Sequence, residues 1–310
     1  LLPIFTQSTE TVLLFSELCV PVPWGEIRGK VWGPDHGRPV LCLHGWADNC
    51  GTFNTLIPLL PKECRYVAVD LAGHGLSSHR PPGVFYSFSA YVADVRRVVD
   101  GLRWTNFSVI GHSMGESVSC FPQFSALYPE MVDALVLLDA YGFLPKEVSK
   151  VMRQGMDEMI QFEKKSEEKK RVYTYEKAVE RLLTANPTLS EQSVRILLER
   201  GLVQVEGGFV FSRDLRVNFK NIVRITLEQS LEMQLRIQAS VLKLFSSKHK
   251  CLQSLINCLW KKNIKSLSLP QHTVVTLPGD HHVHLNDPEV VAPLVSDFLH
   301  AKVLSQQPPA

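Results

Sequence analysis

A serine between two glycines, in a Gly-X-Ser-X-Gly pattern at residues 111–115, is the feature of this chain that most plainly suggests chemistry. The apolar run from Phe107 to Ile110 precedes it and predicts a short buried strand, and helix-compatible sequence follows. A sharp strand-to-helix turn lifts a serine hydroxyl above the sheet and turns the next backbone N–H into the same space. Serine needs this help, because its hydroxyl is a weak nucleophile without a base and a site for negative charge. Ser113 is therefore the candidate nucleophile, and a serine in a helix-capping turn is the alternative.

Short apolar strands alternate with helices along most of the chain, which predicts an α/β fold with a mostly parallel sheet and right-handed crossovers. In such sheets ligands bind beyond the carboxyl ends of the strands. His44, Gly73, Ser113 and Asp139 all follow predicted strand ends, so we expect them at one edge. Strands are expected at Leu18–Trp32 (a pair around a turn), Pro39–Leu43, Arg65–Asp70, Ala134–Asp139, Ala239–Phe245 and His272–Leu277, and helices at Phe53–Leu60, Tyr86–Leu102 and Glu289–Leu299.

The composition changes after Phe143, where the sequence becomes rich in charged residues and its pattern predicts helices. Thr188 and Glu191 have the spacing of a capping box, with a helix end at Arg200-Gly201, and a hairpin is expected around the glycines at 207 and 208. No strand of the parallel sheet fits in this block, so we interpret it as a helical lid over the strand ends. The expected division is a first part of the core at 1–144, the lid at 145–232, a second part of the core at 233–302 and a polar tail at 303–310.

Composition excludes several other classes of protein. The 310 residues are 45% hydrophobic and 21% charged with a net charge of +2, which gives no sign of nucleic-acid binding. No apolar run approaches the length of a membrane span. The seven cysteines are unclustered, which favours reduced thiols over disulfides or a zinc site. We expect no metal or organic cofactor and a small-molecule acyl substrate. The expected location is the cytoplasm, with the peroxisome as the alternative, and the oligomeric state stays open.

Four motifs, in order, resemble those of the α/β-hydrolase superfamily over nearly the whole chain. They are His44-Gly45-Trp46, the D-x-x-G-x-G-x-S pattern at 70–77, the serine motif at 111–115 and the histidine loop at 279–289. Within that superfamily the chain is most similar to the vertebrate serine hydrolase-like proteins, whose HGW-D-N, G-H-S and G-D-H-H-V-H-L-N segments are all present. The resemblance implies an α/β-hydrolase fold with an inserted helical lid.

The resemblance also assigns roles to single residues. Backbone N–H groups of Trp46 and Met114 would form the oxyanion hole. His281 stands in the best register ahead of the proline at 288 and would be the base, with His282 as the second choice. His74 precedes the nucleophile in the chain, so a structural or lining role is expected for it. These roles imply hydrolysis of an ester or similar acyl compound through an acyl-enzyme on Ser113.

The third member of the expected triad is missing from its usual place. The resemblance puts an acid just after the strand that ends at Phe245, yet residues 237–279 contain no Asp or Glu. Asp139 is the candidate replacement, because some lipases of this fold carry their acid after the equivalent strand; Asp280 is less favoured, because adjacent loop residues seldom face each other. Loss of the acid costs about 10⁴ in kcat. We therefore expect a weak serine hydrolase, with a binding or scaffolding protein as the alternative.

Overall fold

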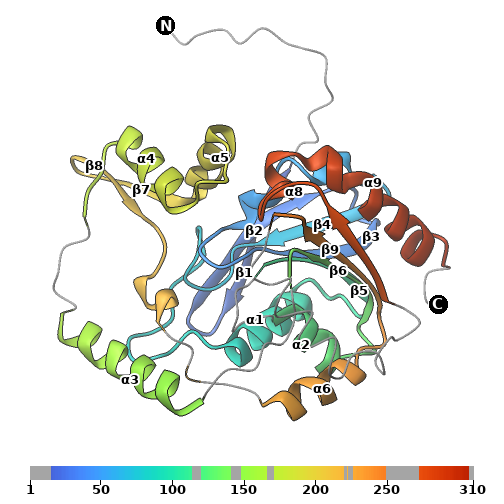
Figure 1. Ribbon diagram of the computed structural model, residues 1–310, viewed down its shortest axis with the longest axis horizontal. Coiled ribbons are helices and arrows are strands. Elements are labelled where there is room, and N and C mark those ends of the chain that lie inside the picture. Colours follow the sequence, from blue (N-terminus) through green and yellow to red (C-terminus); the bar gives the residue numbers. More distant parts are fainter. Residues whose placement is uncertain are drawn as a thin grey trace, which may run out of the picture.

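The computed structural model describes residues 15–113, 120–140, 148–165, 171–219, 222, 226–248 and 272–306. Its centre is an eight-stranded sheet in the order β1-β2-β4-β3-β5-β6-β9-β10 (Figure 1). The β1–β2 and β2–β4 pairs are antiparallel, and the other neighbours are parallel, as expected from the alternation of strands and helices. The strands are β1 (Ser16–Val22), β2 (Gly25–Trp32), β3 (Arg38–Leu43), β4 (Cys64–Val69), β5 (Phe107–His112), β6 (Val132–Leu138), β9 (Ser240–Ser246) and β10 (His272–Leu277).

Both faces of the central strands are buried, which explains why their sequences are mostly apolar. In β3, Leu41 and Leu43 pack on one face, and Val40 and Cys42 pack on the other. Helices α1 (Phe88–Gly101) and α2 (Cys120–Leu127) cover the first face, and α9 (Pro288–Leu299) covers the second (Figure 1). The sheet is thus a rigid layer between helices, and its strand ends can hold side chains in fixed positions.

A long insertion separates β6 from β9. It contains α3 (Val148–Lys164), α4 (Tyr175–Ala185), α5 (Glu191–Gly201), the hairpin of β7 (Leu202–Val205) and β8 (Gly208–Phe211), and α6 (Leu227–Leu235). The hairpin lies where the sequence predicted it, and the described part of this segment contributes no strand to the main sheet. Helices α4 and α5 share a small apolar cluster with Leu285, and Figure 1 shows them beside the main sheet rather than in its layers.

Three local expectations were wrong. The helix expected over Phe53–Leu60 is a pair of short 3₁₀ turns, η1 (Cys50–Phe53) and η2 (Ile57–Leu59), because a proline at 58 cannot donate the hydrogen bond that a continuous helix needs. The cap of α5 is Ser190 rather than Thr188, which lies in a turn closed by the Leu189 N–H and the Asn186 carbonyl oxygen. The polar tail expected from residue 303 starts later in the chain. Val303 is buried in the π-helical turn His300–Leu304, which continues α9.

Gly111 allows α2 to lie close against β5. A Cβ at this position would come within 2.4 Å of the ring of Phe121, which is fully buried. Because a packed core cannot move aside freely, we expect Gly111→Ala to lower the free energy of unfolding by about 1–3 kcal/mol in urea titrations. Gly201→Ala is the control, since a Cβ there would meet its nearest atom at 3.8 Å. Equal effects of the two substitutions would contradict this account of the packing.

Candidate active site

Ser113 directly follows β5 in a strained backbone conformation, with a φ of 51°. Its N–H donates to the carbonyl oxygen of Leu138 on the neighbouring strand β6, at 3.0 Å. Gly45 passes close to the serine, because a Cβ at that glycine would lie 3.0 Å from the Ser113 Cβ. The loop after β3 can therefore approach the serine only because residue 45 has no side chain. A left-handed serine at a strand end is the geometry expected of a nucleophile elbow.

His281 reaches Ser113 from the loop between β10 and α8 (Val283–Asn286). Its Nε2 lies 2.7 Å from the Ser113 Oγ, and its Nδ1 lies 2.6 Å from Oδ2 of Asp139. The ring is partly exposed, at 30% of its side-chain surface, whereas the Asp139 side chain is only 2% exposed. The structure thus places the three predicted residues in one continuous chain of contacts.

The alternatives for these roles point elsewhere. The Nε2 of His282 contacts an oxygen of Asp48, at 3.2 Å. The Asp280 carboxylate pairs instead with the Nζ of Lys248, at 3.1 Å. Within the described residues, Asp139 is therefore the carboxylate that contacts the His281 ring. The histidine that contacts the serine is His281, the one that the sequence predicted from its distance to the proline at 288.

Asp139 is held by Ser246, the last residue of β9. Ser246, at the end of β9, donates its backbone N–H to Oδ1 of Asp139 at 3.0 Å, and its Oγ lies 3.3 Å from Oδ2. The backbone of Asp139 is itself left-handed, with a φ of 46°, and its N–H donates to the Leu244 carbonyl oxygen at 2.7 Å. Sequence reasoning missed Ser246, because a serine at a strand end carries no distinctive signal.

His74 contacts the backbone of the loop that carries Trp46. The Ala47 N–H points at the Nε2 of His74 at 3.4 Å, and the other ring nitrogen lies 3.1 Å from the Ala72 carbonyl oxygen. Burial lowers the pKa of His74 to about 3, so the ring stays neutral and can accept from one N–H while it donates to a carbonyl. This contact fits the structural role expected for His74. The Trp46 indole N–H donates to the Val217 carbonyl oxygen at 3.0 Å, and Met114 lies outside the described residues.

An ion pair joins the insertion to the loop after β4. Arg200 of α5 places its Nε 2.9 Å from Oδ2 of Asp70, and its Nη1 lies 2.7 Å from Glu17 of β1. Asp70 is fully buried and also accepts the backbone N–H groups of Cys50 and Leu76. The position of α5 beside the strand ends thus depends on a buried charge pair.

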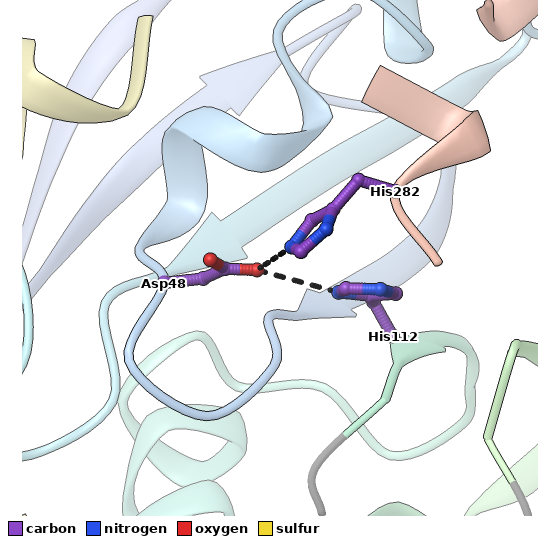
Figure 2. Close-up of side chains that lie close together, drawn as sticks. All are labelled: Asp48, His112 and His282. Carbon is purple, nitrogen blue, oxygen red and sulfur yellow. Dashed lines mark hydrogen bonds and ion pairs between the residues drawn. The ribbon is translucent and has the colours of Figure 1, made fainter. Parts of the chain in front are cut away.

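A second polar cluster lies beside the serine and was missed by sequence analysis. Asp48, His112 and His282 are all buried, and one ligand-type atom from each lies within 4.8 Å of the others (Figure 2). The sequence predicted no metal ligands, because these residues are far apart in the chain and form no recognisable spacing. His112 and His282 adjoin Ser113 and His281 in the sequence, so this group lies next to the Ser113–His281 contact.

Comparison with known proteins defines the class to which this structure belongs. Residues 38–177 match a family model described as the alpha/beta hydrolase fold. A hypothetical protein of Pseudomonas aeruginosa PAO1 has the same fold, with a TM-score of 0.79 and 30% identity over 92% of this chain and 98% of that one. The chain belongs to the α/β-hydrolase family.

Its more specific similarity is to the serine hydrolase-like proteins. A serine hydrolase-like protein of Danio rerio is 56% identical over 289 residues, which are 92% of this chain and 88% of that protein. A thioesterase domain from the curacin biosynthetic pathway is a more distant structural relative, with a TM-score of 0.73 and 25% identity over 91% of this chain and 99% of that domain. No helix in the described part of the chain is both long enough and apolar enough to span a bilayer.

Proposed function

We propose that the protein is a serine hydrolase that cleaves an ester or similar acyl compound through an acyl-enzyme on Ser113. The observation that carries this proposal is the chain of contacts from the Ser113 Oγ through the His281 ring to Asp139, at 2.7 and 2.6 Å. Both distances are within the range in which a proton moves between a nucleophile, a base and the group that orients the base.

In this proposal each residue has a defined step. His281 Nε2 takes the hydroxyl proton while the Ser113 Oγ bonds to the carbonyl carbon of the substrate, and backbone N–H groups of Trp46 and Met114 stabilise the oxyanion. The protonated His281 then gives its proton to the leaving group as the acyl bond breaks. Water, activated by the same ring, releases the acid product and frees the serine. Asp139 keeps Nδ1 protonated and stabilises the imidazolium.

The position of Asp139 supports an enzyme over the binding or scaffolding alternative. A protein kept only for binding has no need of a buried carboxylate against the histidine, with two hydrogen bonds from Ser246 to fix it. The relative described as a thioesterase domain supports acyl chemistry on this fold. We further propose that the insertion, residues 145–232, acts as the lid that selects the acyl group.

Labelling with a fluorophosphonate probe tests the proposal, because the probe phosphonylates only a serine that a base has activated. We expect labelling of the native protein and none of Ser113→Ala. Ser108→Ala is the matched control, since that serine lies on the same strand and bonds to Asp133. Absence of labelling in a native protein that is folded by circular dichroism would contradict a hydrolase function and favour the binding alternative.

A further inference from the structure

In the group formed by Asp48, His112 and His282, one ring nitrogen of His112 has no hydrogen-bond partner among the described residues. The Nε2 of His112 lies 3.0 Å from the carbonyl oxygen of His281. A carbonyl only accepts, so Nε2 carries the hydrogen. The ring is 0% exposed. With Nε2 directed at the carbonyl, the other nitrogen, Nδ1, is the one that can bind an ion through the lone pair of a neutral imidazole.

That lone pair faces another acceptor. The Nδ1 of His112 lies 3.4 Å from Oδ2 of Asp48 and has no hydrogen-bond partner among the described residues. The same Oδ2 lies 3.2 Å from the Nε2 of His282, and Figure 2 shows both rings converging on this one oxygen. Two atoms that can only accept therefore share a buried space. A cation between them would satisfy both, and it would replace the proton through which His282 otherwise bonds to Asp48.

We propose that Asp48, His112 and His282 bind a divalent transition-metal ion such as Zn²⁺. Ligands at 2.0–2.2 Å from a tetrahedral ion lie about 3.3–3.6 Å from one another. The two separations from Asp48 are 3.2 and 3.4 Å, and the nitrogens of His112 and His282 lie within 4.8 Å of each other. Two imidazole nitrogens and one carboxylate oxygen favour Zn²⁺, Co²⁺ or Ni²⁺ over Mg²⁺ or Ca²⁺, which prefer oxygen ligands. Three protein ligands leave the fourth position for water.

The surroundings of the site support this assignment. Metal-bound histidines ordinarily donate their other N–H to a carbonyl or carboxylate, and His112 does so to the carbonyl oxygen of His281. The ligands come from three separate places: the loop after β3, the end of β5 and the loop before α8. A bound ion would therefore tie together the chain segments that carry Gly45, Ser113 and His281, and it would stabilise the folded protein.

The test uses Co²⁺, whose visible absorption reports its ligands. Protein treated with a chelator and then dialysed is titrated with Co²⁺, and we expect one equivalent to give the visible bands of a low-symmetry nitrogen–oxygen site. Cysteine ligation would instead give an intense near-ultraviolet band. Asp48→Asn and His282→Gln are each expected to weaken binding by at least about 100-fold. His300→Gln is the matched control, because that histidine is exposed and its ring Nδ1 contacts the carbonyl oxygen of Ser296; it should bind as the native protein does.

Two results would overturn the proposal: no binding of Co²⁺ or Zn²⁺ at micromolar concentrations, or binding that both ligand substitutions leave unchanged. A second measurement on the native protein covers the case in which the variants do not fold. In the proton NMR spectrum of the Co²⁺ form, we expect two exchangeable, strongly shifted N–H resonances, from the non-ligating nitrogens of His112 and His282. Fewer than two would also overturn the site. None of these readouts depends on hydrolytic activity.

Discussion

Asp139→Asn is expected to lower kcat by about 10⁴-fold while it leaves the fold intact. The carboxylate lies 2.6 Å from the Nδ1 of His281, and in the proposed mechanism it stabilises the imidazolium that forms during acyl transfer. An asparagine of the same shape supplies no negative charge, and its amide can hold the ring in the wrong tautomer. The measurement is the steady-state hydrolysis of a p-nitrophenyl ester, with the melting temperature of the variant recorded beside it.

The neighbouring carboxylate provides the control for this prediction. Asp280→Asn removes the same charge one residue from His281, yet Asp280 pairs with Lys248 rather than with the ring. We therefore expect its kcat to remain within a few-fold of the native value. If Asp139→Asn were no slower than Asp280→Asn, the serine and histidine would act as a pair without this acid. Ser246→Ala should have a smaller effect than Asp139→Asn, because the backbone N–H of residue 246 still holds the carboxylate.

Arg200→Leu is expected to lower the free energy of unfolding by about 3–5 kcal/mol. The substitution leaves the fully buried Asp70 without the guanidinium that neutralises it at 2.9 Å. Removing one partner of a buried pair is costly, because the charge that remains cannot return to water. The same change also releases Glu17 of β1 and loosens α5 from the loop after β4. Urea titration followed by circular dichroism measures the loss.

Arg195→Leu is the matched control, because Arg195 lies on the same helix and pairs with Glu191 at 2.6 Å at the exposed surface. Exposed ion pairs contribute little to the free energy of unfolding, since water already screens both charges. We expect a much smaller shift of the urea midpoint than for Arg200→Leu. Similar shifts for the two variants would show that the buried pair does not hold the insertion on the core.

The sequence predicted the features that depend on local pattern. The apolar runs identified the strands, because strands buried on both faces are apolar along most of their length. The order of four motifs identified the fold and placed Ser113 and His281 near each other. The break in the helix at the proline at 58 and the cap at Ser190 were not predicted. Both depend on single backbone hydrogen bonds, which a helical composition does not indicate.

What depends on tertiary contact was harder to predict. Asp139 was named only as a candidate replacement, since nothing in the sequence says which strand-end carboxylate faces a distant loop. The partnership of Arg200 with Asp70 and the grouping of Asp48 with His112 and His282 each join segments far apart in the chain. Such contacts follow from the register of the sheet and the packing of the insertion, which single-sequence patterns do not encode.

The pairing of β5 with β6 places the serine and the acid in one local unit of the chain. These strands are adjacent and parallel, and the Ser113 N–H already bonds to Leu138, the residue before Asp139. Nucleophile and acid thus belong to one strand–helix–strand unit, and closing a short chain loop costs less entropy than closing a long one. Had the acid followed β9, the whole insertion would lie between the two. Here the insertion lies outside the stretch of chain that joins the serine to the acid, and the strand that follows it, β9, contributes the hydrogen bonds of Ser246 and Leu244 to Asp139.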